Sequence, residues 1–189
     1  MAEDLRETVA AAAEDGIRCG IVAVFLAGVR RRKPGAVANA VLALAGTYLP
    51  RVIERYGDVT LRPWQRVYAS AAMVTHAVGM LGPYDDTWWW DHLTHTHSAT
   101  LLGGVVHAAS RRRDTDPAPR VVGVVMGVGV VWEALESAIH AVARRLGVEP
   151  ILVTYGKRDT FLDLCFDFVG ACLVVLLGDR LLGNTFERD

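Results

Sequence analysis

Three stretches of this 189-residue chain contain no Asp, Glu, Lys or Arg, and each is close to the length that crosses a bilayer. They run from Pro34 to Pro50, from Val67 to Tyr84 and from Leu93 to Ser110. A helix of about 20 residues spans the hydrocarbon core of a membrane, with a range of about 17–25. These runs therefore predict helices that span a membrane.

Three further apolar segments carry only a few charged residues. Together with the charge-free runs they predict an all-α, polytopic transmembrane bundle of about six helices, forming a single membrane domain over residues 1–189. The expected helices lie near residues 9–29, 35–53, 66–82, 92–110, 120–146 and 159–182. A soluble bundle is the less favoured alternative, because its surface helices would show a polar face. Residues 36–49 and 67–81 offer almost none.

Composition excludes several other classes of protein. Hydrophobic residues make up 52% of the chain, which is too apolar for disorder. Three cysteines, an odd number, do not form a disulfide scaffold. A net charge of -1 gives no attraction toward nucleic acid, so we expect no nucleic-acid partner and membrane lipid as the surroundings.

The distribution of basic residues favours one orientation. With six crossings, eleven Lys and Arg residues fall on the side of the two termini and eight on the other side. Basic residues are enriched in cytoplasmic loops. We therefore expect a multi-pass protein of the plasma membrane with both termini in the cytoplasm.

The fourth expected helix opens with an acid and an imidazole one turn apart. Asp91 and His95 are separated by four residues, so they share a helix face. Such a pair can ligate a metal ion or transfer a proton, although Asp91 can equally serve as a helix cap. His92 and His97 are expected to point away from this face.

The fifth expected helix carries two glutamates well inside an apolar segment. Glu133, Glu136 and His140 fall within an arc of about 60° on the helix surface. An intramembrane charge costs about 2.5–3.5 kcal/mol, and two adjacent carboxylates also repel each other. A metal, a shared proton or a cation must compensate them. The alternative is a structural ion pair with Arg18 or Arg158.

The sixth expected helix begins with three aspartates at intervals of four residues. Asp159, Asp163 and Asp167 therefore form one stripe. Successive membrane helices alternate in direction. The acids at the start of the fourth helix, in the second half of the fifth and at the start of the sixth should thus lie toward the same membrane face.

These motifs, taken in order, resemble the YjdF-like family of small polytopic membrane proteins. The resemblance covers roughly the last two thirds of the chain, and a more distant similarity links it to VanZ-like membrane proteins. It implies an integral membrane protein without an established biochemical role and supplies no substrate. The positions it carries over are Asp91, His95, Glu133, Glu136, Asp159 and Asp163; the pattern that holds them also includes Tyr155 and Gly170.

Two functions and a structural role remain open. The first is a metal-dependent hydrolase of a lipid-type substrate, with a divalent ion held by Asp91, His95, Glu136, Asp159 and Asp163. Glu133 or His140 would then be the general base. The second is a small cation- or proton-coupled transporter, which at this size would work as a homodimer. The third is an accessory protein whose acids close a polar network, so the sequence does not decide whether the chain is an enzyme.

Overall fold

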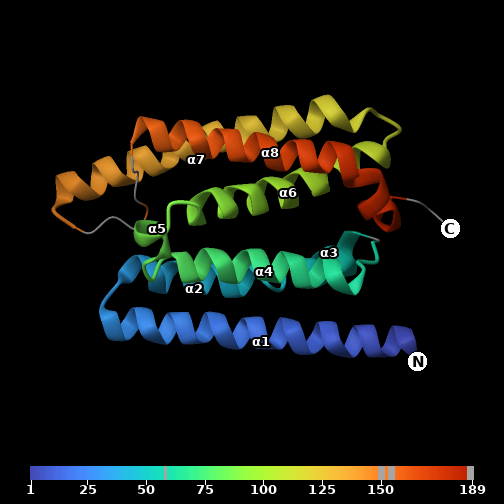
Figure 1. Cartoon of the computed structure of the whole chain (residues 1–189), viewed down its shortest axis with the longest axis horizontal. Helices are drawn as coiled ribbons and strands as arrows, with labels where there is room; N and C mark the ends of the chain where they lie inside the picture. Colours follow the sequence, from blue (N-terminus) through green and yellow to red (C-terminus); the bar gives the residue numbers. More distant parts are fainter. Residues whose placement is uncertain (58, 149–151, 153–155, 187–189) are drawn as a thin grey trace. The chain divides into compact units, whose positions relative to one another are not determined.

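The computed structural model describes residues 1–57, 59–148, 152 and 156–186. Within these residues the chain is helical and contains no strand, which confirms the all-α prediction (Figure 1). The elements are α1 (Ala2–Arg31), α2 (Pro34–Gly46), α3 (Leu49–Gly57), α4 (Pro63–Gly79), α5 (Pro83–Asp86), α6 (Trp90–Arg111), α7 (Pro117–Leu146), α8 (Lys157–Leu182) and a closing 3-10 turn, η1 (Gly183–Thr185).

The ends of α7 show why helix boundaries fall slightly outside the apolar runs. The carboxylate of Asp116 accepts a hydrogen bond from the backbone N–H of Ala118 at 3.0 Å, and Pro117 occupies the first turn. At the other end Gly147 adopts a left-handed conformation with φ 68°. Asp and Pro are preferred at the start of a helix, and Gly is preferred just after its end. The helix expected from residue 120 therefore begins three residues earlier.

The second expected helix differs from its prediction. Residues 35–53 were expected to form one helix, but α2 ends at Gly46 and α3 begins at Leu49. Pro50 accounts for the break, because a proline ring clashes with the carbonyl group four residues earlier, here that of Gly46, and has no N–H to donate. The two helices together still form an apolar segment of membrane-spanning length, Pro34–Gly57.

The chain packs as two compact units, Met1–Thr87 and Trp88–Asp189. This division does not test the single membrane domain over 1–189, which stays a prediction. In the first unit α1, α2 and α4 pack side by side (Figure 1). Their shared core is formed by the buried residues Ile21, Val24, Ala40, Ala43 and Ala77.

The charges of α1 are compensated inside the first unit. Nη2 of Arg18 lies 2.9 Å from Oε2 of Glu14, and Nε of Arg66 lies 3.2 Å from Oε1 of the same glutamate. A second carboxylate, Asp15, lies 2.7 Å from Arg18. Arg18 thus already has two carboxylate partners on its own helix.

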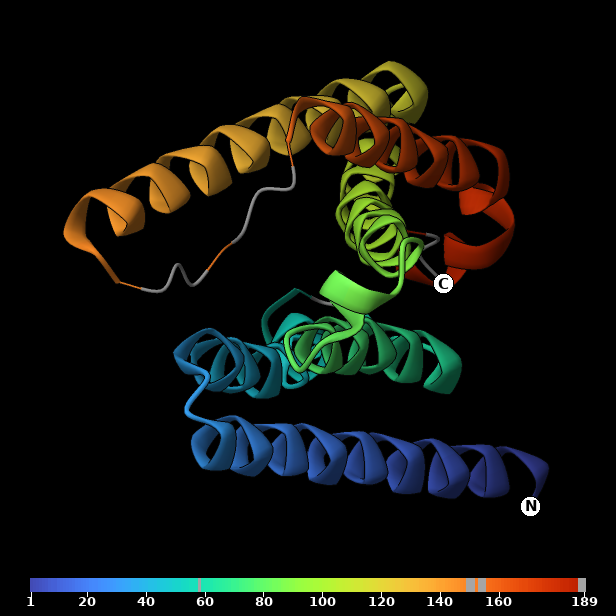
Figure 2. The same cartoon turned by 60° about the vertical axis from the view of Figure 1, so that its left-hand side comes forward.

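In the second unit α6 lies against both α7 and α8 (Figure 2). Helices α6 and α8 run in the same direction and keep one register. His95 pairs with Asp167, and His107 pairs with Asp179, twelve residues further along both helices. Between these two pairs the core is apolar and is formed by Ala99, Val121, Val125, Ala171 and Val174.

Close approach of α8 to α6 depends on Gly170. A Cβ atom on this residue would lie 2.6 Å from Cβ of Ala99 and 2.9 Å from the carbonyl oxygen of Thr96. Neither distance is tolerated, so only glycine lets the two helices meet at this point. This contact lies one turn from Asp167 and two turns from Asp163, and it brings both against α6.

Three helical segments among the described residues are long and apolar enough to cross a membrane. They are Pro34–Gly57, Pro117–Leu146 and Lys157–Thr185. The other three expected crossings correspond to α1, α4 and α6. Helix α1 carries buried charges, α4 ends after 17 residues, and α6 contains several histidines. A count of six crossings therefore stays a prediction.

Candidate metal centre

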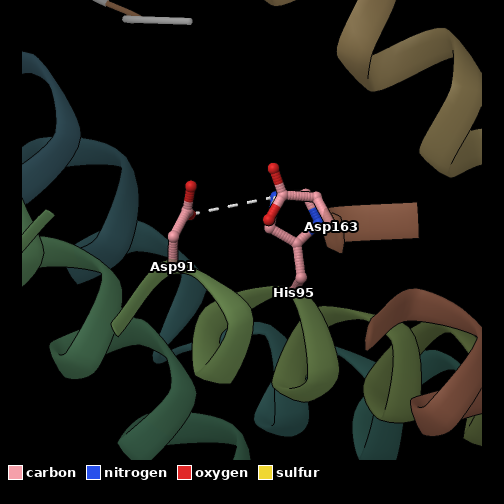
Figure 3. Close-up of side chains that lie close together, drawn as sticks. All are labelled: Asp91, His95 and Asp163. Atoms are coloured by element: carbon pink, nitrogen blue, oxygen red, sulfur yellow. Dashed lines mark ion pairs between the residues drawn. The ribbon is translucent and has the colours of Figure 1, made fainter. Parts of the chain in front are cut away.

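The first turn of α6 presents Asp91 and His95 on one face, as their spacing predicts. Nε2 of His95 lies 3.9 Å from Oδ1 of Asp91 (Figure 3). The hydroxyl group of Thr94 donates to the backbone oxygen of Asp91 at 2.8 Å and lies 3.3 Å from its Oδ1. Asp91 is therefore held by its own helix, with its carboxylate turned toward the imidazole.

Asp163 of α8 completes a group of three. Its Oδ1 lies 4.0 Å from Nε2 of His95, and one ligand atom from each of the three residues lies within 4.8 Å of the others (Figure 3). Asp163 is only 2% exposed, and His95 is also buried. Two carboxylate oxygens and one imidazole nitrogen form a donor set suited to Mn²⁺, Fe²⁺ or Zn²⁺.

Separate side chains orient His95 and Asp163. Oδ1 of Asp167 lies 3.2 Å from Nδ1 of His95 and accepts its N–H, which leaves Nε2 free to face the cluster. Nδ1 of His92 lies 3.1 Å from Oδ1 of Asp163. Metal-binding histidines generally donate their second ring N–H to a carboxylate or carbonyl group, as His95 does here.

Gly129 of α7 makes room for Asp167. A Cβ atom at this position would overlap the carboxylate of Asp167 and would lie 3.2 Å from Leu164. The missing side chain lets the carboxylate of Asp167 lie directly against the α7 backbone while it contacts Nδ1 of His95. The orientation of His95 therefore depends on all three helices of the unit.

Glu133, one turn after Gly129 on α7, faces the same imidazole. Its Oε1 lies 3.9 Å from Nε2 of His95 and is buried without a hydrogen-bond partner. The hydroxyl group of Thr160 lies beside its carboxylate. A buried carboxylate oxygen without a partner costs free energy, and here it is aimed at the cluster.

Two further predicted site residues, Glu136 and Asp159, lie around this centre. Glu136 is close enough to Glu133 and Asp91 to interact with them electrostatically, and Asp159 is close enough to Asp91 and Asp163. Neither belongs to the group of three. Tyr155 of the motif lies outside the described residues.

His140 is also set apart from the three candidate ligands. It follows Glu133 by seven residues, about two turns further along α7. Its Nδ1 is buried without a hydrogen-bond partner. No ion pair or hydrogen bond among those of the described residues links it to the cluster.

Sequence reasoning missed the positions of two side chains. His92 was expected to point away from the cluster, and this is wrong, because α8 packs on that side and brings Asp163 to it. Asp167 was recognised as a member of the α8 stripe but not as the partner of His95. The spacing of four residues from Asp163 was the available sign, since it places both on the face that meets α6.

A second polar group lies at the far end of α6 and α8. Nε2 of the buried His107 lies 3.3 Å from Oδ1 of Asp179, whose carboxylate also accepts two hydrogen bonds from Arg111. The guanidinium group compensates this carboxylate and leaves no comparable place for a cation.

These features define an all-helical membrane protein with a buried cluster of acids and histidines at the start of two parallel helices. Residues 16–184 match the family described as "Predicted membrane protein (DUF2238)", and the chain belongs to that family. No curated protein and no solved structure matches the chain.

Proposed function

We propose that this chain is a membrane-embedded, metal-dependent hydrolase that acts on a lipid-type substrate. Asp91, His95 and Asp163 would hold one divalent ion, and Glu133 would act as the general base. Catalytic metal sites typically combine three protein ligands with an open position for water. The proposal goes beyond membership of the family, whose description names a membrane protein and no reaction.

One arrangement carries the proposal. Three potential ligand atoms lie within 4.8 Å of one another, and beside them the buried Oε1 of Glu133 has no hydrogen-bond partner. What sets this oxygen apart from the other buried atoms without a partner is that it faces Nε2 of His95, 3.9 Å away, in the middle of the cluster. The ligands are oriented by other side chains, whereas Glu133 keeps one oxygen free, as a group that accepts a proton needs to do.

The chemistry would follow from this division of roles. A divalent ion lowers the pKa of a bound water to about 7. Glu133 would accept one proton from that water while the oxygen of the water attacks an ester carbon or phosphorus. The bond to the leaving alcohol would then break, and the alcohol oxygen would take up the proton from Glu133. Base catalysis of this kind contributes about 10²–10⁴-fold.

A lipid-type substrate is supported by the surroundings of the cluster. Two of the three segments of membrane-spanning length, Pro117–Leu146 and Lys157–Thr185, contribute residues to it. Large exposed apolar side chains lie near it, among them Trp88, just before α6, and Phe161, near the start of α8. A substrate that reaches this position must itself enter the membrane.

A cation- or proton-coupled transporter is less well supported. Transport requires access to the site from both membrane faces in turn. On the side of the cluster that leads toward His107, the core between α6, α7 and α8 is closed by Val121 and Val125 of α7 and Ala171 of α8, which are almost fully buried. Along this contact the hydroxyl group of Thr96 is already engaged with the backbone oxygens of His92 and Phe166. Residues 96–106 of α6 and 168–178 of α8 contain no carboxylate that could pass a proton or cation on toward His107.

The outer residues complete the proposal. Glu136 and Asp159 would add negative charge around the ion, and His140 would be an alternative base only if α7 moved along its axis. We place the protein in the plasma membrane with cytoplasmic termini, surrounded by lipid and paired as a homodimer. The motifs that resemble the YjdF-like family all lie within residues 16–184, the part of the chain matched by its family, and kinship with YjdF-like proteins belongs to the proposal.

Metal content tests the proposal directly. Detergent-purified protein would be dialysed against a mixture of Zn²⁺, Mn²⁺ and Fe²⁺ and measured by inductively coupled plasma mass spectrometry. We expect about one ion per chain, lost in Asp163→Asn and kept in Asp86→Asn, an exposed aspartate of α5. No ion in the wild type, or equal loss in both variants, would overturn the proposal.

A further inference from the structure

His92 is the buried residue of α6 to which the proposed function gives no role. It is 5% exposed, and its Nδ1 lies 3.1 Å from Oδ1 of Asp163. It cannot bind the same ion through this nitrogen, because the nitrogen already faces the carboxylate. What it contacts is one of the three candidate ligands.

Stacking against an aromatic side chain holds the imidazole ring of His92 in place. The ring lies parallel to that of Phe166, with 4.6 Å between the centroids and 1° between the planes. Trp88 approaches from another side with its ring edge, at 6.2 Å. Phe166 follows Asp163 by three residues on α8, so one helix face supplies both the stacking surface and the hydrogen-bond acceptor. The ring therefore has little freedom to turn its Nδ1 away.

We propose that His92 is a positioning residue for the metal centre, acting through Asp163. Its Nδ1–H donates to Oδ1 of Asp163 and restrains the rotation of the carboxylate, so that the carboxylate stays directed at Nε2 of His95. This inference rests on the proposed function, because it requires Asp163 to be a ligand.

The arrangement repeats the His95–Asp167 pair with the roles exchanged. In one pair the imidazole is the ligand and the carboxylate of Asp167 orients it; in the other the carboxylate is the ligand and the imidazole of His92 orients it. Each pair links α6 to α8. Loss of such an orienting partner typically weakens metal binding about 10–100-fold.

A packing role for His92 would give the opposite response to substitution. The His92→Asn variant places an amide N–H close to the position of Nδ1 but loses the ring that stacks on Phe166. The His92→Phe variant keeps a stacking ring but has no donor. If His92 positions Asp163, Asn retains metal binding and Phe does not; if His92 only packs, Phe retains it and Asn does not.

The experiment is a titration of the purified full-length protein with Co²⁺, followed by visible absorption of the bound ion. We expect His92→Phe to raise the dissociation constant about 10–100-fold and to change the Co²⁺ spectrum. The His92→Asn protein should stay close to the wild type in both. As a matched control, His97→Phe makes the same substitution outside the cluster and should change neither.

A third variant covers the case in which His92→Phe does not fold. The His92→Gln variant remains polar, but its amide nitrogen corresponds to Nε2 rather than Nδ1, so we expect weakened binding where Asn retains it. Equal binding by Asn and Gln, or stronger binding by Phe than by Asn, would overturn the positioning role while leaving the metal site intact. A wild type that binds no Co²⁺ would instead overturn the metal site and this inference with it.

Discussion

His95 and Asp167 are joined across two helices by a contact of 3.2 Å between Nδ1 and Oδ1. The same imidazole points its other nitrogen at Asp91, Glu133 and Asp163, each between 3.9 and 4.0 Å away. One buried ring therefore connects four carboxylates from three helices. Its orientation decides which nitrogen is offered to a ligand.

Removal of the orienting carboxylate should weaken metal binding. In Asp167→Ala the His95 ring loses its acceptor and is free to rotate or to adopt the other tautomer. We expect the affinity for a divalent ion to fall about 10–100-fold, measured by Co²⁺ titration.

The control for this change is Asp179→Ala. Asp179 also pairs with a buried histidine of α6, but at the far end of α8. It should leave the affinity unchanged. An equal loss in both variants would indicate a general weakening of the α6–α8 contact instead of a specific effect on the site.

Glu133→Gln should separate metal binding from catalysis. The amide keeps the size of the side chain but cannot accept a proton, so we expect normal metal content together with a loss of hydrolytic rate of about 10²–10⁴-fold. The measurement is product release from a panel of ester and phosphoester lipids in nanodiscs. Loss of the ion from the variant would show that Glu133 is a ligand, not a base.

Gly129→Ala should disturb the site without touching a ligand. The new Cβ would overlap the carboxylate of Asp167, which must move away from the α7 backbone. We expect weaker Co²⁺ binding and a lower thermal midpoint, measured by differential scanning fluorimetry.

Gly127→Ala is the matched control, two residues earlier on the same helix, where a Cβ would meet nothing within 4 Å. Because alanine favours a helix by about 1 kcal/mol over glycine, this variant should be as stable as the wild type or more so. A similar loss of binding in both variants would contradict the role given to Gly129.

The topology can be mapped with single cysteines. After Cys19, Cys165 and Cys172 are replaced by serine, Thr115→Cys and Asp86→Cys each carry one reactive thiol. Six crossings place residue 115 on the cytoplasmic side and residue 86 on the outer side. A membrane-impermeant maleimide added to intact cells should label only the cysteine at 86. The reverse pattern would invert the proposed orientation, and labelling of both would exclude six crossings.

The helices were largely predictable because bilayer length leaves a strong pattern in the sequence. All six expected segments contain a helix, and the main error was the break before Pro50, where a local steric clash interrupts an otherwise uniform apolar run. The pairing of Asp91 with His95 was also predictable, because both lie on one helix and spacing alone relates them.

Contacts between helices were harder to predict. His92 meets Asp163 only because Gly170 sets how closely and at what register α8 lies on α6. The spacing of residues within one helix does not show how that helix is aligned along its neighbour. For the same reason the sequence could not show that Glu136 and Asp159 lie outside the group formed by Asp91, His95 and Asp163.

The shared register of α6 and α8 restricts how this part of the chain can move. Both His–Asp pairs, twelve residues apart on each helix, are made in the same alignment. A shift of α8 by one turn along α6 would break both at once and would also drive Ala99 out of the place that Gly170 leaves for it. Sliding is therefore an all-or-none event for this pair of helices: Asp163 and Asp167 either both meet the histidines of α6 or both lose them.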